Sequence, residues 1–339
     1  MALALSVLDQ SPVRSGGTAL QAIEETVALA QATEKLGYHR YWLAEHHGTE
    51  GLAGCAPEIL IARVAAATRT MRIGSGGVML SHYSPLKVAE NFALLATMYP
   101  GRIDLGLGRA PGGDHLTTIA MQYGSEIGVE YYPTKVLDLK AFITGSAPAN
   151  AALAKVKVTP RPPQPPELWL LGSSAESAKL AAMFGLPFAF AHFINAHGAR
   201  QIIADYMTDF QPSDTLKAPR AALCVGAICA DTKAQAERLA LSRGLWRVML
   251  EQGALGPYPT PEEAEAYPYT PLERRIAERS KSGAIIGDPT SVKKDIEHMA
   301  AEHGVDEMMI VTICHSFAAR LHSYELIAQA FALPARAAA

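Results

Sequence analysis

The chain has 339 residues, of which 49% are hydrophobic and 19% are charged, and its formal net charge is −3. This composition can build a large core, and it provides no basic field that would favour nucleic acid or an anionic membrane as a partner. No apolar run approaches the roughly 18 residues that cross a bilayer, and the first residues lack the basic start of a signal peptide. We therefore expect a cytoplasmic protein.

Short apolar runs alternate with helical patterns along the chain. The runs that predict strands are Leu3–Leu8, Arg40–Ala44, Arg72–Leu80, Arg102–Gly108, Leu168–Leu171, Phe188–Ala191, Arg220–Cys229 and Glu307–Cys314. Helical spacing predicts helices over Ala19–Leu36, Pro57–Ala67, Leu86–Met98, Val129–Phe142, Ala175–Phe184, Ala199–Phe210, Lys233–Gln252, Thr290–His303 and Ala318–Phe331. Two irregular insertions, 110–166 and 253–282, follow the fourth and seventh strands.

Eight alternating βα units favour an α/β fold, a single (β/α)₈ TIM barrel over residues 1–335 with a frayed tail at 336–339. An open doubly wound sheet is the structural alternative. Active sites of such barrels lie at the carboxyl ends of the strands, so the residues just after each strand are the candidates for chemistry.

The four cysteines, Cys55, Cys224, Cys229 and Cys314, include no pair at C-x-x-C spacing. We interpret them as small buried hydrophobic residues in a reducing compartment and not as a metal or redox site.

Two histidines and a glutamate follow the second strand, as Glu45, His46 and His47. A histidine at a strand end can serve as a general base, and Glu45 could orient one of the two rings. A polar strand end without function is the alternative. A metal site is a third interpretation, with Asp104, His192 and His315 as further ligands, but adjacent histidines diverge and the chain has no His-x-His on its first strand.

Two features favour a bound phosphate. Arg109 follows the fourth strand among glycines and is suited to a bidentate contact with an anion. Gly172, Ser173, Ser174 and Ser177 follow the fifth strand at the start of a helix, whose free N–H groups attract anions. A surface arginine and a simple helix cap are the alternatives.

The third strand, RIGSGGVML, has glycines at Gly74, Gly76 and Gly77 although it is otherwise apolar. Glycine within a strand often marks a close approach of another surface to the backbone. A flat ring lying against Gly76 and Gly77, between the histidines and Arg109, would account for the missing side chains. These features together favour a flavin mononucleotide or a deazaflavin.

Several stretches resemble the bacterial luciferase-like flavin monooxygenases, in particular the luciferase family oxidoreductases of group 1. They are SVLDQSP, LGYHRYWLAEHH, RIGSGGVMLSHYSPLKVAE, PGRIDLGLGRAPG, GSSAESAKLAA, GLPFAFAHF and the terminal ICH and RLHSYELIAQAF. They extend from the first strand to the last helix, so the resemblance covers nearly the whole chain.

The resemblance implies roles for individual residues. His46 would be the catalytic base, with His47 second and Glu45 beside them. The family's non-proline cis peptide falls on Gly76–Gly77. Its phosphate ligands fall on Arg109, Ser174 and Ser177, with backbone contacts from Gly172 and Ser173. The remaining pocket candidates are His82, Tyr83, His192 and His315.

Two positions depart from luciferase. Gly108 stands where luciferase has a reactive cysteine, and no arginine occurs between Asp114 and Tyr132, where luciferase has a second phosphate ligand. We therefore expect either a changed affinity for FMN or compensation by Ser173. Nothing in the chain supports bioluminescence.

The resemblance implies two-component chemistry. An NAD(P)H:flavin reductase would supply reduced FMN, which reacts with O₂ to a C4a-(hydro)peroxyflavin that oxygenates a small organic substrate. The two irregular insertions are suited to a lid that excludes water. A homodimer is expected, without nucleic acid, membrane or metal. The alternatives are hydride transfer with F420 or FMN on the same fold, a flavin-binding protein without catalysis, and a metal hydrolase.

Overall fold

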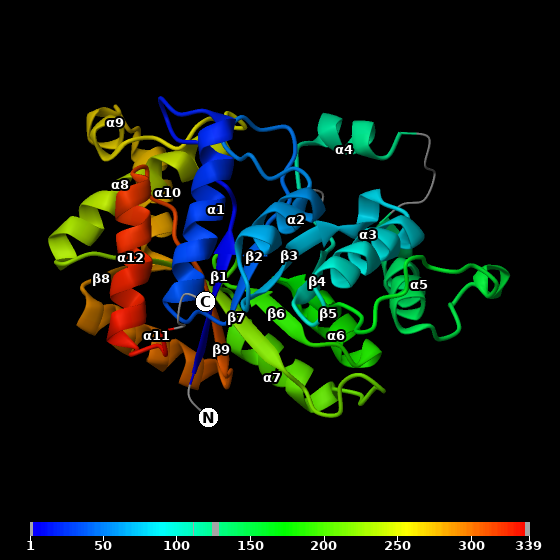
Figure 1. The fold of residues 1–339 in the computed structure, drawn as a ribbon. Helices are drawn as coiled ribbons and strands as arrows, with labels where there is room; N and C mark the ends of the chain where they lie inside the picture. The colour runs from blue at the N-terminus through cyan, green and yellow to red at the C-terminus, as the bar shows by residue number, and fades with distance from the viewer. Residues whose placement is uncertain (1–2, 111, 124–128, 336–339) are drawn as a thin grey trace.

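The computed structural model describes residues 3–110, 112–123 and 129–335 (Figure 1). Its strands are β1 (Ala4–Asp9), β2 (Arg40–Leu43), β3 (Arg72–Met79), β4 (Ile103–Gly108), β5 (Glu167–Gly172), β6 (Phe188–Ala191), β7 (Ala221–Cys229), β8 (Ala284–Gly287) and β9 (Glu307–Val311). Its longer helices are α1 (Ala19–Lys35), α2 (Pro57–Ala67), α3 (Pro85–Met98), α5 (Tyr132–Thr144), α6 (Ala175–Phe184), α7 (Ala199–Asp209), α8 (Lys233–Glu251), α10 (Pro271–Ser282), α11 (Pro289–His303) and α12 (Phe317–Ala330). Short helical segments are α4 (His115–Met121), α9 (Pro261–Ala266) and the 3₁₀ turns η1 (Leu80–His82), η2 (Val129–Tyr131) and η3 (Ala151–Leu153).

The strands form a closed parallel barrel. β1 to β7 pair in chain order, β7 pairs with β9, and β9 pairs with β1. The helices surround this sheet, and the first strand lies beside the last barrel strand, β9 (Figure 1). The predicted (β/α)₈ barrel is confirmed, because each of the eight predicted runs contributes one barrel strand.

Residues at the helix ends account for the helix boundaries. Thr18 and Thr232 form capping boxes at the starts of α1 and α8, each with a glutamine three residues later. Gly185 and Gly304 adopt left-handed backbone conformations just after α6 and α11, where glycine ends helices without a Cβ penalty.

The structure adds a strand that the sequence analysis missed. β8 pairs in parallel with the last four residues of β7, Gly226 to Cys229, beyond the part of β7 that pairs with β6. Its four residues, AIIG, follow directly on α10 and are too few to show a period. The insertion before β8 is not irregular throughout, since it contains α9 and α10, and α10 packs on α8.

Aromatic side chains fill the middle of the barrel. Trp42 of β2 and Trp169 of β5 are fully buried and meet edge to face, with ring centroids 5.3 Å apart. They pack with small inward residues of the neighbouring strands, among them Ala189, Ala222 and Cys224. This layer separates the two ends of the barrel.

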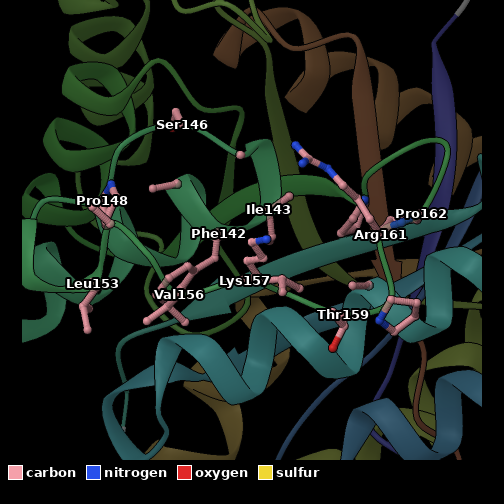
Figure 2. A pocket seen from close by; sticks show the side chains of 17 residues that line it. Phe142, Ile143, Ser146, Pro148, Leu153, Val156, Lys157, Thr159, Arg161 and Pro162 are labelled. Carbon is pink, nitrogen blue, oxygen red and sulfur yellow. The ribbon is translucent and has the colours of Figure 1, made fainter.

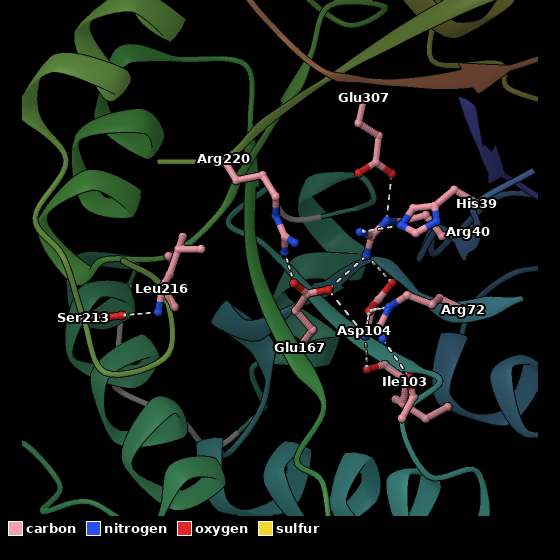
Figure 3. Close-up of polar contacts among 12 residues, drawn as sticks. His39, Arg40, Arg72, Ile103, Asp104, Glu167, Ser213, Leu216, Arg220 and Glu307 are labelled. Carbon is pink, nitrogen blue, oxygen red and sulfur yellow. Dashed lines mark hydrogen bonds and ion pairs between the residues drawn. The ribbon is translucent and has the colours of Figure 1, made fainter. Parts of the chain in front are cut away.

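A cluster of paired charges closes the amino ends of the strands (Figure 3). Arg40 lies at its centre and donates to Asp104 at 2.8 Å, to Glu307 at 2.7 Å and to Glu167 at 3.1 Å. Arg72 pairs with Asp104, and Arg220 pairs with Glu167.

The charges in this cluster balance, with three arginines and three carboxylates. Burial alone would raise the pKa of Asp104, but Arg40 and Arg72 hold that pKa below its usual value. Trp42 adds a hydrogen bond from Nε1 to Asp104, at 2.9 Å. Asp104 is therefore a member of a satisfied structural network, not of the suggested metal site.

Three of the four cysteines are buried, as predicted, but Cys55 is exposed in the segment before α2. The prediction is wrong for Cys55 because the chain leaves the barrel after β2. Among the described helices, none combines the length and the apolar character needed to span a bilayer. The predicted tail, 336–339, lies outside the described residues.

Candidate active site

A cavity of about 490 Å³ opens at the carboxyl ends of the barrel strands. All seven residues predicted to bind a cofactor line it: Gly76, Gly77, Arg109, Gly172, Ser173, Ser174 and Ser177. They come from β3, from the position just after β4, and from the stretch that runs from the end of β5 into the first turn of α6. The structure thus brings together residues that lie up to 101 positions apart in the chain.

One corner of the cavity is suited to an anion. Ser174 caps α6, and its Oγ accepts a hydrogen bond from the Ser177 amide at 3.4 Å and lies 3.3 Å from Ser177 Oγ. The first turn of α6 therefore presents hydroxyl groups and the positive end of the helix dipole to the cavity. Arg109 reaches the same corner from β4 and forms an ion pair with Glu176 of α6.

Glycine is required in this corner by close packing. A Cβ on Gly172 would overlap Cβ and Oγ of Ser177, so the turn after β5 can lie this close to α6 only without a side chain. The glycine also leaves the backbone of the turn open to the cavity.

The glycines of β3 also allow close contacts between strands. A Cβ on Gly77 would lie 2.7 Å from the carbonyl oxygen of Gly106 in β4, and a Cβ on Gly76 would lie 3.0 Å from Cβ of Trp42. Neighbouring protein atoms therefore also demand glycine at these positions, and the flat ring against this backbone stays a prediction. Both glycines nevertheless expose backbone to the cavity.

The Gly76–Gly77 peptide bond is cis, as predicted. The pairing of β3 with β4 shifts register at this point, between Gly76 and Val78.

The Glu45–His46–His47 segment follows β2 and is fixed by its backbone. The amide of His46 donates to the Gly54 carbonyl and the amide of His47 donates to the Gly112 carbonyl, each at 2.8 Å. Glu45 is 1% exposed. Its Oε1 accepts hydrogen bonds from His47 Nε2 at 2.8 Å and from the Tyr83 hydroxyl at 2.7 Å.

His46 differs from His47 in its surroundings. Burial, followed by the neighbouring His47, lowers the pKa of His46 to about 4, so its ring is neutral near pH 7. Its Nδ1 atom is buried and makes no hydrogen bond with any described residue.

Two of the four further pocket candidates, His82 and Tyr83, lie beside Glu45 and His47. The His82 ring lies edge-on to His47, with centroids 6.3 Å apart, and edge-on to Tyr83. Burial, followed by the hydrogen bond to Glu45, raises the pKa of Tyr83 well above its usual value, so its hydroxyl stays protonated as a donor.

Neither the residues of this cluster nor the other two candidates are among the residues that line the cavity. Side chains alternate between the two faces of β6, and Ala191 at its end lines the cavity. The ring of the next residue, His192, therefore points away from the barrel interior, and it lies edge-on to His303 of α11. His315 donates from Nε2 to the Ser15 carbonyl at 2.9 Å. His192 and His315 do not line this cavity, and the role of all four candidates in a substrate pocket stays a prediction.

Several lining residues were missed by the sequence analysis. Leu8, Leu171, Phe193 and Ile194 give the cavity an apolar wall, and Met79 and Cys224 complete it. The period of two along each strand could have indicated Leu8, Leu171 and Cys224, because they share a face with inward residues of the layer below. Phe193 and Ile194 follow β6 and have no such signal.

The departures from luciferase have structural counterparts. Gly108 lies against Met79, whose Sδ would be 3.3 Å from a Cβ at that position. Burial raises the pKa of Tyr132 in α5, and the nearby Arg109 lowers that pKa by a smaller amount.

Within the described residues, no group of three or more His, Cys, Asp or Glu side chains could hold a metal ion.

A separate surface cavity of about 410 Å³ lies outside the barrel, between α3, α5 and the segment 145–166 (Figure 2). Figure 2 shows Phe142 and Val156 on its apolar side and Arg161 on another. None of the predicted site residues lines it, so the candidate active site is the cavity at the strand ends.

Known proteins resemble this chain over nearly its whole length. The family model for luciferase-like monooxygenases matches residues 1–307. A luciferase-like monooxygenase of Escherichia coli (strain K12) is 39% identical over 324 residues, 96% of each chain. An N-acetyl-S-alkylcysteine monooxygenase of Bacillus subtilis (strain 168) is 37% identical over 330 residues, 96% of this chain and 97% of its own.

Solved structures share the fold. Apo-MsnO8 has a TM-score of 0.90 at 38% identity and covers 98% of this chain and 100% of its own. The oxygenating constituent of 3,6-diketocamphane monooxygenase from Pseudomonas putida, in complex with FMN, has a TM-score of 0.71 at 18% identity, covering 97% and 98%. An F420-dependent secondary alcohol dehydrogenase has a TM-score of 0.70 at 16% identity, covering 98% and 99%.

Proposed function

Because this chain belongs to the luciferase-like monooxygenase family, we propose that it is a two-component, FMN-dependent monooxygenase. It would take reduced FMN from a separate NAD(P)H:flavin reductase and use O₂ to oxygenate a small organic substrate. The observation that carries the proposal is the cavity at the strand ends, with an anion-binding corner at one side and an apolar wall at the other.

The residues of the cavity fit a flavin phosphate. Arg109 supplies a cation, the first turn of α6 supplies N–H groups, and Ser174 and Ser177 supply hydroxyls. A volume of about 490 Å³ lies within the range typical of sites for ligands of this size.

When bound, reduced flavin would supply the activation of O₂, which side chains cannot provide. The chain's own residues would bind the flavin and shield it from water. Arg109 and α6 would anchor the phosphate, and Leu8, Leu171 and Phe193 would exclude water from the part of the cavity that they line. The Glu45–His46–His47 segment would handle protons. The resemblance implies His46 as the base, with His47 as the second candidate.

A hydride-transfer reaction with F420 or FMN is the second candidate, because the anion-binding corner would serve any flat cofactor with a phosphate. The two reactions differ in their need for O₂. A turnover assay under anaerobic conditions separates them, since oxygenation stops and hydride transfer continues.

The name of one relative indicates a substrate class to test first. The Bacillus subtilis relative is named an N-acetyl-S-alkylcysteine monooxygenase, and the apolar wall of the cavity here offers a surface for an alkyl group. A first substrate panel should contain thioethers of that type, with ketones and simple alkanes as comparison classes.

Flavin titration tests the proposed function directly. Purified protein should bind FMN and reduced FMN, and Arg109→Ala should weaken FMN binding by roughly 10- to 100-fold, the value of a charge-assisted contact of about 1.5–3 kcal/mol. Riboflavin, which lacks the phosphate, should bind wild type and variant alike. Absence of flavin binding by the wild type, or an equal loss for riboflavin, would refute the assignment.

We also propose a homodimer. Ile59 of α2 is 69% exposed, and Leu94 and Met98 of the neighbouring α3 are 49% and 47% exposed. These side chains could pack against a second copy. Light scattering should give twice the chain mass of 36.2 kDa, and Ile59→Glu should reduce the measured mass toward that of one chain.

The free thiols of Cys224, Cys229 and Cys314 support a reducing compartment such as the cytoplasm.

A further inference from the structure

The surface cavity between α3, α5 and the segment 145–166 has the size of a binding site (Figure 2). Its volume of about 410 Å³ falls within the range of roughly 300–1,000 Å³ that is typical of small-molecule sites. None of its lining residues belongs to the cavity at the strand ends. A ligand bound here would therefore occupy a place of its own, outside the barrel.

Proline stiffens the wall of this surface cavity. The segment 145–166 contains six prolines, and proline fixes its own φ angle and restricts the residue before it. A wall of this kind loses little conformational freedom when a ligand binds, which lowers the cost of binding. Four of the six line the cavity, namely Pro148, Pro160, Pro162 and Pro166.

Apolar side chains supply one side of the surface cavity. Phe142 and Ile143 come from the last turn of α5 and are only partly buried. Val156, which is 38% exposed, comes from the segment 145–166. An alkyl chain or an aromatic ring that covered these side chains would remove apolar surface from water.

Two cations, Lys157 and Arg161, also line the surface cavity. Among the residues that the structure describes, no aspartate or glutamate lines it, and neither cation forms an ion pair or a hydrogen bond. The segment 145–166 contains Lys155 as a third cation and no acidic residue, although the formal net charge of the whole chain is −3. The positive charge at this cavity is therefore not balanced by the protein itself.

The carboxyl end of α5 positions one of the two cations. A Cβ on Gly145 would overlap Nη2 of Arg161, so the guanidinium lies directly against the backbone where α5 ends. Gly145 adopts the left-handed conformation that allows this end. A helix end carries only about half an elementary charge, so it attracts the guanidinium without neutralising it.

From these observations we propose that the surface cavity is an accessory binding site for a small organic anion with an apolar body, of the aryl or alkyl carboxylate class. The carboxylate pairs with Lys157 and Arg161, because a guanidinium matches its two oxygens. The body of the ligand packs against Phe142 and Val156. A concave site with an apolar side favours such a compact ligand over an acidic protein segment. The assignment does not depend on the proposed function, since the two cavities share no residue.

A matched pair of probes tests the charge requirement. 2-Naphthoate combines a carboxylate with a rigid apolar body, and 2-naphthamide is its neutral counterpart. Calorimetric titration should show about tenfold tighter binding of 2-naphthoate by the wild type. Lys157→Gln and Arg161→Gln should each weaken binding of 2-naphthoate roughly three- to tenfold and leave 2-naphthamide unaffected. Lys155→Gln, which removes a cation of the same segment that does not line the cavity, should match wild type.

Methyl nuclear magnetic resonance shows where the probe binds. In protein labelled at the isoleucine and valine methyl groups, 2-naphthoate should shift the resonances of Ile143 and Val156, and it should do so equally in Arg109→Ala. Shifts confined to Ile194, which lines the cavity at the strand ends, would overturn the proposal. Far-ultraviolet circular dichroism confirms that each variant is folded.

Three further outcomes would also overturn the proposal. Equal affinities of the wild type for 2-naphthoate and 2-naphthamide would show that the two cations do not recognise the ligand. An equal loss of 2-naphthoate binding in Lys155→Gln would show a general effect of surface charge. Tighter binding of a hexaglutamate peptide than of 2-naphthoate would assign this surface to an acidic protein segment instead.

Discussion

Arg109 and Glu176 form an ion pair across the corner of the cavity, between the end of β4 and the first turn of α6. Glu176 is 63% exposed on its side chain and Arg109 is 30% exposed. The cation that we assign to the cofactor phosphate is therefore partly neutralised in the unliganded protein, and an incoming phosphate must compete with a carboxylate for it.

Glu176→Gln should strengthen FMN binding. Exposed pairs are worth about 0–1 kcal/mol, so the expected gain is at most about fivefold in affinity. Fluorescence titration with FMN and riboflavin measures it, and riboflavin should show no gain because it has no phosphate. A weaker affinity for FMN would mean that Glu176 holds Arg109 in place for the ligand.

Gly172→Ala should damage the anion-binding corner, because its Cβ would overlap Ser177. Overpacking of this kind costs about 1–3 kcal/mol. A double-mutant cycle with Ser177→Gly tests the cause. Gly172→Ala should lower the free energy of unfolding in urea much less in the Ser177→Gly background than in wild type. Equal costs in both backgrounds would show that the Gly172–Ser177 contact is not responsible.

Arg40→Met should destabilise the barrel strongly. The change leaves Asp104, Glu167 and Glu307 buried or half-buried with fewer partners, and breaking a buried pair from one side costs about 3–5 kcal/mol. Arg238→Met, which removes an exposed arginine that also pairs with two glutamates, is the control and should change little. Similar unfolding free energies for the two variants would contradict the structural role of the cluster.

His46 should make stability depend on pH. Its pKa is lowered to about 4 in the folded protein from 6.5 in the unfolded chain, so the unfolded state binds more protons between these values. Stability should therefore fall as the pH decreases from about 6.5 toward 4, by up to ~2 kcal/mol at pH 5 from this ring.

The comparison of wild type with His46→Asn isolates that contribution. Unfolding in urea at pH 7.5 and pH 5 should show a smaller loss for the variant, since His39 and His192, whose pKa values are also lowered by burial, remain in both proteins. The exposed His298→Asn serves as reference. An identical loss in wild type and His46→Asn would show that the ring takes up its proton as readily in the folded state.

The barrel could be predicted because each strand carries a local signal. Runs such as Met308 to Val311 are apolar on both faces, and each is followed or preceded by a helical period. Arg109 and the serines after β5 could also be located, because strand ends of a barrel meet at one rim. β8 could not be predicted from the sequence, because four residues show no period and because its pairing with β7 is a tertiary contact.

The contacts of Glu45 lay beyond the sequence for a different reason. Tyr83 lies 38 positions away and Met79 contributes through its backbone amide, for which no residue type gives a signal. The reason for the glycines in β3 was also hidden, because it depends on the neighbouring strand: Gly77 faces the Gly106 carbonyl only once β3 and β4 are paired.

The charge cluster around Arg40 and the Trp42–Trp169 layer above it have a kinetic consequence. They fill the barrel on the amino-terminal side of the cavity, so we expect a ligand to enter and leave at the carboxyl ends of the strands. Under the proposed function, a cofactor lying deeper than its substrate would have to bind before the substrate and leave after the product. Binding should therefore be ordered, and a molecule that covers the rim should block loading and release together.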